Sequence, residues 1–193
     1  MLIQNTTKEI IKKLQDDGIS KEMQALETSS WCVIEQQTDK ITGIAGIGGI
    51  FNITSIFIDK DHRGKGLGKS LQTTLVNEAK NRRYSFLAVF IDPTNTSSIK
   101  LHDQLGYKSI FRIRYSKEIT QEIKILVFNT RGKLIEKLLH IFNTLVGITF
   151  LAIILKITTP IFPQLISYKS KAMPKPSIKW IIANFEKIHC KTN

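Results

Sequence analysis

A short apolar run, a glycine-rich turn and an amphipathic helix follow one another between residues 55 and 71. The run 55–59 has the composition of a β-strand, and the turn after it holds Gly64, Gly66 and Gly68 at every second position. An apolar stripe then recurs at every fourth residue, at Leu67, Leu71, Leu75 and Ala79. Small residues let backbone N–H groups approach an anion, and the free donors and the dipole of a helix N-terminus favour negative charge. The segment therefore predicts a phosphate-binding loop between a strand and a helix.

Two common phosphate-binding motifs do not fit this loop. A P-loop requires a glycine five residues before Gly68, where the chain has Arg63, although Gly68-Lys69-Ser70 matches the end of that motif. The dinucleotide fingerprint requires glycines spaced two and three apart, whereas those of this loop are spaced two and two. The pattern that remains is Arg63-x-x-Gly66-x-Gly68, directly after a strand.

A second motif follows the amphipathic helix. Residues 86–91 form a continuous apolar run, which is typical of a strand buried on both faces. A turn at 92–94 leads to a short predicted helix, which Asn95 opens and which ends in Leu105-Gly106-Tyr107.

Together the two motifs resemble those of the GNAT superfamily, the acyl-CoA-dependent N-acetyltransferases, and they stand in that family's order. The resemblance covers most of residues 1–129. It implies an α/β (α+β) fold with a mixed, mostly antiparallel central sheet and helices on both faces. We expect an acetyltransferase domain over residues 1–130 and a hydrophobic and basic helical C-terminal extension over 131–193.

The resemblance also implies acetyl-CoA as a co-substrate. The pantetheine arm is expected along the exposed backbone edge of Ile56, Phe57 and Ile58. Asn95 matches the family's CoA-contacting asparagine. Core packing of the three strand residues and N-capping by Asn95 are alternatives that the residues alone leave open. The diphosphate is expected on the backbone N–H groups of the loop, with nearby charge from arginine and lysine: Arg63, Gly64, Lys65, Gly66, Leu67, Gly68 and Lys69.

The second helix carries the predicted catalytic residue. Many family members place a tyrosine there, which protonates the leaving thiolate, and the matching position in this chain is His102. Asn95, Ser98 and His102 are spaced by three and four residues, so they share one helix face. A free thiol has a pKa of about 8.5, so a histidine with a pKa near ~6.5 is able to assist its departure. The alternative is a partly exposed helix histidine without a catalytic role.

The other catalytic groups are less well defined by the sequence. Phe90 stands in the strand where some relatives carry a basic carboxylate, and Glu35 is a weaker candidate for the base. Cys32 has no recognisable catalytic partner. We therefore expect direct attack of a primary amine, from a small molecule or a protein, on acetyl-CoA in a ternary complex. The alternative function is a catalytically weak or inactive acyl-CoA-binding regulatory module, and the sequence does not identify the acceptor.

Charge and hydropathy set the last third of the chain apart. Residues 131–193 carry ten basic and two acidic side chains, a net charge of +8 out of +12 for the chain. The run 138–155 contains no charged residue, and 177–189 has the pattern of an amphipathic helix. A single membrane span is disfavoured by the positive-inside rule, because it would place the seven lysines after residue 155 on the non-cytoplasmic side. A re-entrant or interfacial anchor at an anionic membrane surface through residues 138–189 and a soluble helical appendage are the interpretations that stay open. Nucleic acid is disfavoured as a partner, because the lysines lie among isoleucines and not among stacking aromatics.

Cysteine content and the N-terminal residues bear on the compartment. Cys32 and Cys190 lie far apart and form no metal-ligand spacing with the four histidines, so we predict reduced thiols and no metal site. The first residues lack the apolar core of a signal peptide. We expect a cytoplasmic protein, either free or at the cytoplasmic face of a membrane.

Shorter patterns predict the remaining elements. Residues 7–15 and 20–27 are expected to form helices. The resemblance implies that they lie over the acceptor cleft and help to shape the substrate pocket, and packing against the sheet is the alternative. The glycines of the second predicted strand, Gly43 among them, suggest close backbone approach. Strands are predicted at 31–36, 41–47, 53–59, 108–115 and 122–129.

Overall fold

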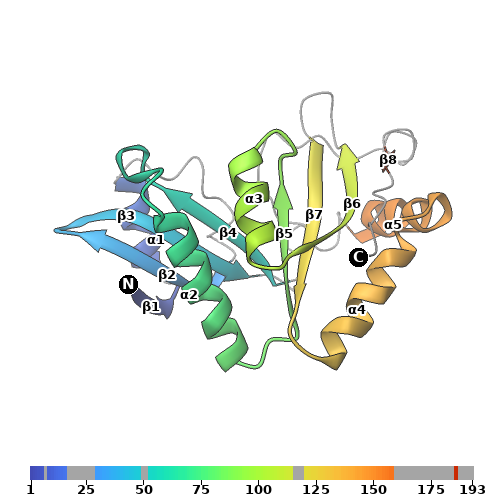
Figure 1. Cartoon of the computed structure of the whole chain (residues 1–193), viewed down its shortest axis with the longest axis horizontal. Coiled ribbons are helices and arrows are strands. Elements are labelled where there is room, and N and C mark those ends of the chain that lie inside the picture. Colours follow the sequence, from blue (N-terminus) through green and yellow to red (C-terminus); the bar gives the residue numbers. More distant parts are fainter. Residues whose placement is uncertain (7, 17–28, 49–51, 115–119, 159–184, 187–193) are drawn as a thin grey trace. The chain divides into compact units, whose positions relative to one another are not determined.

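The computed structural model describes residues 1–6, 8–16, 29–48, 52–114, 120–158 and 185–186 (Figure 1). The chain forms two compact units that divide between Tyr84 and Ser85. Each unit has antiparallel strands with helices on both faces of its sheet. This confirms the predicted fold class.

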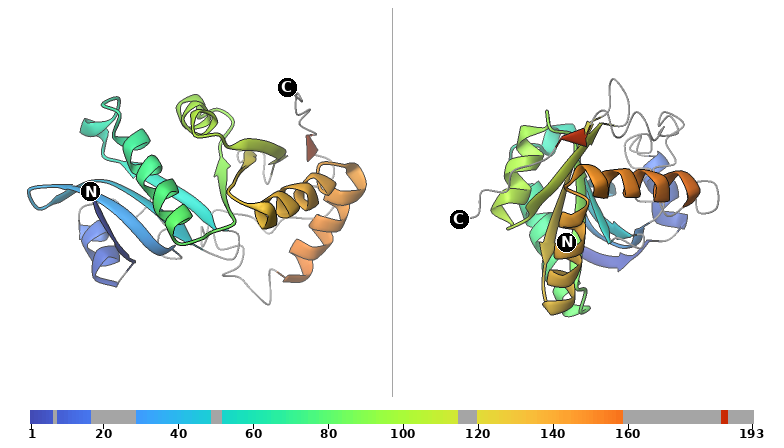
Figure 2. Two further views of the ribbon diagram at one scale, coloured as in Figure 1. Left: turned by 60° about the horizontal axis from the view of Figure 1, so that its bottom comes forward. Right: turned by 90° about the vertical axis from the view of Figure 1, so that its right-hand side faces the viewer.

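The first unit contains four strands, whose order in the sheet is their order in the sequence: β1 (Leu2–Asn5), β2 (Ser29–Gln37), β3 (Lys40–Gly48) and β4 (Ile53–Ile58). Helices α1 (Lys8–Asp16) and α2 (Leu67–Asn81) cover opposite faces of this sheet (Figure 2). Ile10 and Leu14 of α1 pack on buried side chains of the strands, namely Cys32, Ile34, Ile41 and Ile44. The helix predicted over 7–15 is thus confirmed, and the one predicted over 20–27 lies outside the described residues.

At Gly43 of β3, side chains of α2 pack directly on the sheet backbone. A Cβ built there would lie 2.7 Å from Leu71 Cδ1 of α2 and 3.1 Å from Ile58 Cδ1 of β4. These distances are shorter than ordinary van der Waals contacts. The close approach predicted from the glycines of this strand is therefore confirmed at Gly43.

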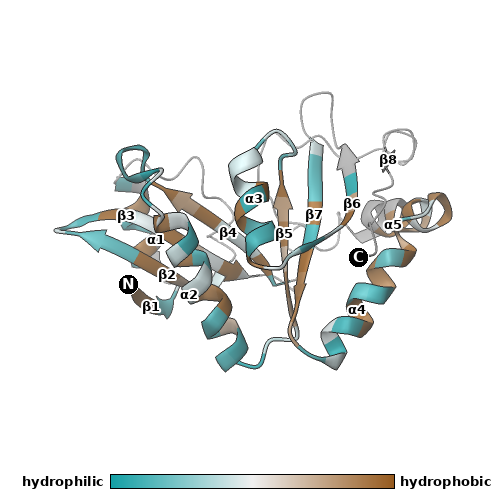
Figure 3. Cartoon of the chain, in the orientation of Figure 1, coloured by the Kyte–Doolittle hydropathy of each residue, from teal (hydrophilic) through white to brown (hydrophobic). Residues whose placement is uncertain are grey.

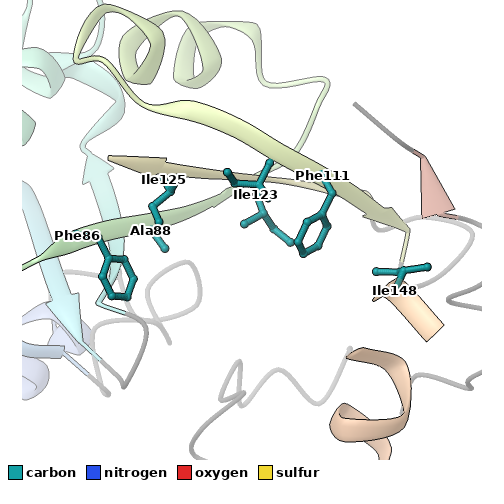
Figure 4. Close-up of a cluster of buried hydrophobic side chains, with 7 residues drawn as sticks. Phe86, Ala88, Phe111, Ile123, Ile125 and Ile148 are labelled. Carbon is teal, nitrogen blue, oxygen red and sulfur yellow. The ribbon is translucent and has the colours of Figure 1, made fainter. Parts of the chain in front are cut away.

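The second unit is built on three strands in the order β5 (Phe86–Ile91), β7 (Thr120–Val127) and β6 (Lys108–Arg114). The antiparallel pairing of β6 with β7 confirms the predicted closing hairpin. Helix α3 (Thr96–Gln104) lies on one face of these strands, and α4 (Thr130–Ile141) and α5 (Leu145–Thr158) lie on the other. The core under α4 and α5 consists of Phe86, Ala88, Ile110, Phe111, Ile123, Ile125 and Ile148 (Figure 4).

The uncharged run 138–155 does not form one helix, because the chain turns between Ile141 and Leu145. Thr144 fixes this turn: its hydroxyl donates to the carbonyl of Ile141 (2.7 Å) and accepts from the N–H of Gly147 (3.1 Å). Within the described part of the chain, no helix has both the length and the hydropathy to cross a bilayer by itself. Helix α4 and residues Leu145–Leu151 of α5 have that length and hydropathy only when they are taken together, and the two helices are bent by 103° relative to each other.

Two short strands were not predicted. Strand β1 pairs with β2 along the N-terminal edge of the first unit. Strand β8 (Phe185–Glu186) pairs with Arg112 and Ile113 of β6. The helix predicted over 177–189 is thus wrong at these two residues, because the free backbone edge of β6 offers them strand pairing. The other residues of that predicted helix lie outside the described part.

Candidate functional site

The glycine-rich turn connects β4 to α2 in the first unit. After Ile58 a short 3-10 helix (Lys60–His62) leads into the turn, where Gly64 and Gly66 adopt left-handed backbone conformations with φ of 77° and 80°. A Cβ at either glycine would meet no atom within 4 Å. The left-handed backbone, and not crowding, is therefore the reason for glycine at these two positions. The side of the turn on which those Cβ atoms would lie is open space.

Asp59 anchors this turn to the sheet. Its backbone N–H donates to the carbonyl of Thr42 (2.9 Å), and its carboxylate accepts from His62 Nδ1 (3.0 Å) and Lys40 Nζ (3.4 Å). The hydrogen bond from His62, with a smaller contribution from Lys40, lowers the pKa of the Asp59 carboxyl. The carboxylate is therefore ionised at neutral pH and holds the start of the turn in place.

The N-terminus of α2 lacks the side-chain cap that other helices of the protein have. Asn95 at the N-cap of α3 accepts from the N–H of Ser98 (3.0 Å), and Asn129 at the N-cap of α4 accepts from the N–H of Gly132 (3.0 Å). The N-cap of α2 is Gly66, which makes no side-chain hydrogen bond. The first backbone donors of α2 thus remain available to an external acceptor, in the dipole field that favours an anion.

Three cationic residues belong to the turn and the first turn of α2. The side chain of Arg63 is exposed, and its Nε donates to the carbonyl of Ile58 at 2.9 Å, which ties the turn to the end of β4. Lys65 in the turn and Lys69 in the first turn of α2 are also exposed. The loop therefore combines free N–H donors, a helix dipole and positive side chains, the set that a diphosphate requires.

Strand β4 is the last of the four strands of the first unit. Ile56, Phe57 and Ile58 are half-buried, and the side chain of Phe57 packs against the core on the α1 face. The packing interpretation is thus confirmed for Phe57. Contact of this strand edge with pantetheine stays a prediction.

In the second unit, Asn95, Ser98 and His102 line one face of α3, as predicted. The side-chain oxygen Oδ1 of Asn95 accepts from the N–H of Ser98, which confirms the N-cap role of Asn95. The hydroxyl of Ser98 lies 3.4 Å from His102 Nδ1. Contact of Asn95 with CoA is a separate prediction, which this geometry does not test.

His102 is fully buried, so the interpretation as a partly exposed helix histidine is wrong. Its Nδ1 lies 2.8 Å from the carbonyl oxygen of Ser98 and donates to it, and its ring packs edge-on against Tyr107 at a centroid distance of 5.0 Å. Burial, together with the nearby Lys124 ammonium, lowers the pKa of His102, although the Ser98 hydrogen bond and the charge of Asp103 act in the opposite direction. The imidazole is therefore neutral at pH 7, with its proton on Nδ1. Its Nε2 has no hydrogen-bond partner among the described residues.

A buried charged network beside His102 was not predicted. Glu122 of β7 accepts from Arg112 Nη2 (2.8 Å) and Ser109 Oγ (2.5 Å), and Lys124 Nζ lies 3.2 Å from Glu122 and 2.6 Å from Asp103 of α3. Burial acts to raise the pKa of Glu122, but hydrogen bonds from Arg112 and Ser109 and the charge of Lys124 outweigh it, so the pKa is lowered. The sequence signal was two opposite charges two residues apart on one strand, of which Lys124 pairs with Asp103 of α3.

Cys32 and Glu35 were the weaker candidates for a nucleophile and a base. Cys32 is completely buried, and burial raises the pKa of its thiol, so the sulfur is protonated at neutral pH and poorly nucleophilic. Glu35 Oε2 forms an ion pair with the amino group of Met1 at 3.2 Å.

Comparison with known proteins is consistent with this geometry. The chain is 36% identical over 53 residues to the L-amino acid N-acyltransferase MnaT of Escherichia coli, which is 28% of this chain and 31% of that protein. It is 30% identical over 83 residues to an L-methionine sulfoximine/L-methionine sulfone acetyltransferase of Salmonella typhimurium, which is 39% of this chain and 48% of that one. The chain thus spans between about a third and a half of the length of these relatives.

Solved structures share the fold at low sequence identity. The ribosomal-protein-alanine N-acetyltransferase of Brucella melitensis superposes with a TM-score of 0.53 at 17% identity, over 66% of this chain and 100% of that one. The yncA protein of Salmonella typhimurium, solved with its cofactor acetyl-CoA, gives a TM-score of 0.50 at 19% identity, over 67% and 94% of the two chains. The profile of the Acetyltransferase (GNAT) family matches residues 4–107, a range that includes the uncapped start of α2 and the whole of α3. Since this match covers more than half of the sequence, the chain belongs to the GNAT family of acetyltransferases.

Proposed function

We propose that the protein transfers an acetyl group from acetyl-CoA to a primary amine by direct attack within a ternary complex. The observation that carries this proposal is the uncapped N-terminus of α2, preceded by Gly64 and Gly66 in left-handed conformations. Family membership supports it. The relatives with similar sequence are named as N-acyl- or acetyltransferases of amino acids and amino-acid derivatives, and this supports the choice of acceptor proposed below.

The residues of the loop fit the diphosphate of acetyl-CoA. The first N–H groups of α2 would donate to it, Lys65 and Lys69 would add positive charge, and Arg63 holds the turn against β4 through its Nε. Acetyl-CoA supplies the activated acyl group, and its thiolate leaves readily because a thiol has a pKa of about 8.5. Holding amine and thioester in one orientation provides most of the acceleration in such a reaction.

The burial of His102 restricts the part that it could take in catalysis. Donation of a proton to the thiolate from Nε2 would require a protonated imidazole, which burial opposes. The Nδ1 proton is held by the carbonyl of Ser98. Assistance to the leaving group by His102 therefore requires a change in its environment when substrates bind.

For the acceptor we propose the α-amino group of a free amino acid or a close analogue. The support is the activity for which the two relatives are named, an L-amino acid N-acyltransferase and an L-methionine sulfoximine/L-methionine sulfone acetyltransferase. An alkyl amine with a pKa near ~10.4 is only about one thousandth neutral at pH 7, so an amine with a lower pKa reacts more readily where no strong base is present.

The test is binding followed by turnover, using the full chain. Isothermal titration should detect acetyl-CoA binding at micromolar concentrations. Release of CoA should then occur with L-methionine sulfone, L-methionine sulfoximine and other L-amino acids, and more slowly with spermidine or with a peptide that has a free N-terminus. Absence of acetyl-CoA binding at high micromolar concentrations would refute the proposal, and turnover only with the peptide would refute the acceptor class.

An acyl-CoA-binding module without turnover is the second candidate function. It is favoured by the burial and the lowered pKa of His102. Tight binding of acetyl-CoA with no CoA release for any amine, and no change in affinity on His102→Gln, would favour it. Turnover that falls at least tenfold in kcat in that variant, with KM for acetyl-CoA unchanged, would exclude it.

We also propose a cytoplasmic location, since acetyl-CoA is available there. Contact of the C-terminal extension with an anionic membrane surface through residues 138–189 belongs to the same proposal. Residues 159–184 and 187–189 lie outside the described part of the chain, so the structure bears on this contact only through α4, α5 and β8.

A further inference from the structure

Helices α4 and α5 leave a large apolar surface uncovered in the second unit. On α4, Leu134, Leu138 and Ile141 are 59%, 51% and 57% exposed. On α5 the exposed apolar side chains are Leu145 (63%), Val146 (81%), Phe150 (58%) and Ile153 (39%). Seven large apolar side chains exposed on two consecutive helices indicate an interaction site. We call these seven side chains the α4–α5 outer face.

Cations border the outer face along α4. Leu134, Leu138 and Ile141 are spaced by four and three residues and so form one stripe along the helix. Lys133 and Lys137, each one residue before a leucine of the stripe, lie along one side of it, and Arg131 lies on the other; all three are exposed. Hydrophilic and hydrophobic residues accordingly alternate along α4 in Figure 3.

Acidic residues contribute little to this face. Glu136 is the one acidic residue of α4, its side chain is 16% exposed, and it lies 3.6 Å from Lys108 Nζ. The sequence of α5 contains no acidic residue. The outer face is therefore apolar with a positive border, the pattern of a helix that lies in the interface of an anionic bilayer.

The positive charge at the border of the α4–α5 outer face distinguishes three partners that could cover it: a second copy of the chain, the chain's own tail and an anionic lipid surface. A second copy of the chain on this face would bring the cations of one copy close to those of the other, which is unfavourable. Residues 159–193 carry six lysines and one glutamate, so the same objection applies to coverage by the chain's own tail. An anionic lipid surface complements the border and accepts the leucine, isoleucine and phenylalanine side chains.

The inner faces of the two helices limit how they meet a bilayer. Ile135, Leu139 and Phe142 of the α4 segment, and Ile148 and Leu151 of α5, pack on the core of the β5–β7–β6 sheet. Insertion of the helices across the bilayer would strip them from the sheet and leave its apolar core uncovered, which is unfavourable. Each helix is also shorter than the hydrocarbon layer of about 30 Å.

From this geometry we infer that the protein docks on anionic membranes through the α4–α5 outer face. The helices lie in the plane of the lipid head groups, and their inner faces stay on the sheet. This inference is independent of acetyl transfer, since it rests on side chains that are no part of the proposed acetyl-CoA site.

The experiment is co-sedimentation of the full chain with vesicles of phosphatidylcholine and phosphatidylglycerol in equal parts, compared with phosphatidylcholine alone. The double variant Leu134→Ser, Leu138→Ser should weaken binding to the anionic vesicles by roughly tenfold or more, because two apolar side chains no longer enter the interface. Leu2→Ser on β1 is the matched control, since Leu2 is 57% exposed and lies in the other unit. That control should bind as the wild type does.

Charge is tested separately by Lys137→Gln. Loss of one lysine near an anionic surface should weaken binding about fivefold. The matched control is Lys12→Gln on α1, an exposed lysine of the first unit, which should have no effect. Three results would overturn the inference: no preference of the wild type for anionic vesicles, equal binding of the double variant and its control, or a dimer in light scattering that only the double variant dissociates.

Discussion

Replacing Gly66 by alanine tests the acetyl-CoA site at the point on which the proposal depends. The backbone φ at Gly66 is 80°, and a Cβ there would meet no atom within 4 Å. The cost in folding free energy is therefore the left-handed conformation alone, about 1–2 kcal/mol. For a chain of this length, that lowers Tm by roughly 2–8 °C.

The effect on ligand binding should be larger than this strain explains. The new methyl group would occupy the open side of the turn, next to the first N–H groups of α2. A hydrogen bond to a charged group contributes about 1.5–3 kcal/mol, so loss of one such bond to the diphosphate weakens acetyl-CoA binding by roughly tenfold to a hundredfold. Isothermal titration at a temperature well below Tm measures this directly.

Gly106→Ala is the matched control. Gly106 has φ of 85°, its Cβ would lie 3.7 Å from Leu126 Cδ1, an ordinary contact, and it follows the C-terminus of α3 in the second unit, whereas the phosphate loop belongs to the first. The same loss of Tm is expected, with acetyl-CoA affinity within about twofold of the wild type. If the two variants lose equal stability and bind acetyl-CoA equally well, the turn at Gly66 does not hold the diphosphate, and the proposed site is wrong.

Three further predictions follow from other described contacts. Asn95→Ala and Asn129→Ala each remove an N-cap hydrogen bond, so each should lower stability by about 1 kcal/mol in urea titrations. Only Asn95→Ala should raise KM for acetyl-CoA. A rise of KM in both variants would mean that helix fraying alone is responsible. Because the folded-state pKa of His102 is lowered, the unfolded chain binds more protons below about pH 6.5, so stability should fall from pH 7 towards pH 5 by at most about 1.4 kcal/mol per pH unit. His102→Gln should abolish that slope in denaturation curves measured across this range, and an unchanged slope would contradict the burial of a neutral imidazole. Glu122→Gln should lower stability by about 3 kcal/mol at pH 7, since it leaves the buried ammonium of Lys124 with one carboxylate fewer. In acid, below the lowered pKa of Glu122, the wild-type carboxyl is protonated and the difference from the wild type should shrink; a difference independent of pH would refute the ionised state.

The phosphate loop was predictable because its signals are local. Gly64 and Gly66 need left-handed backbone, and the leucine stripe of α2 begins directly after them, so a window of about twenty residues contains the strand, the turn and the helix start. The N-cap role of Asn95 is local in the same sense. The sequence also predicted that Ser98 and His102 share a face, since this depends only on helix geometry.

The burial of His102 and Glu122 was not predictable from the same kind of pattern. Alternation along 122–129 identifies two faces of a strand, but the charged side chains suggest that one of those faces is in water. Helix α3 covers that face, and the charges of Glu122 and Lys124 satisfy each other there. Which face of α3 turns inwards depends on tertiary packing, so His102 had no sequence signal for complete burial.

The break between α4 and α5 shows how hydropathy obscures a turn. Eighteen residues without a charge read as one apolar segment, and Asn143 and Thr144 are too weakly polar to interrupt that pattern. The spacing of Thr144 and Gly147 is the N-cap spacing, and it is the one local sign that a new helix begins there. A capping search inside uncharged runs would have found it.

The missing cap of α2 connects stability with binding. Asn at an N-cap is more favourable than Gly by a few tenths of a kcal/mol, and α3 and α4 both use it. Gly66 forgoes that gain and leaves the first donors of α2 in water. A ligand that accepts those hydrogen bonds restores the lost interaction only in the folded state, so at a concentration of about 100 times its Kd it should stabilise the chain by about 2.7 kcal/mol. The same helix start thus accounts for a local loss of stability without ligand and for a gain when a diphosphate binds, which a turn selected only for folding would not require.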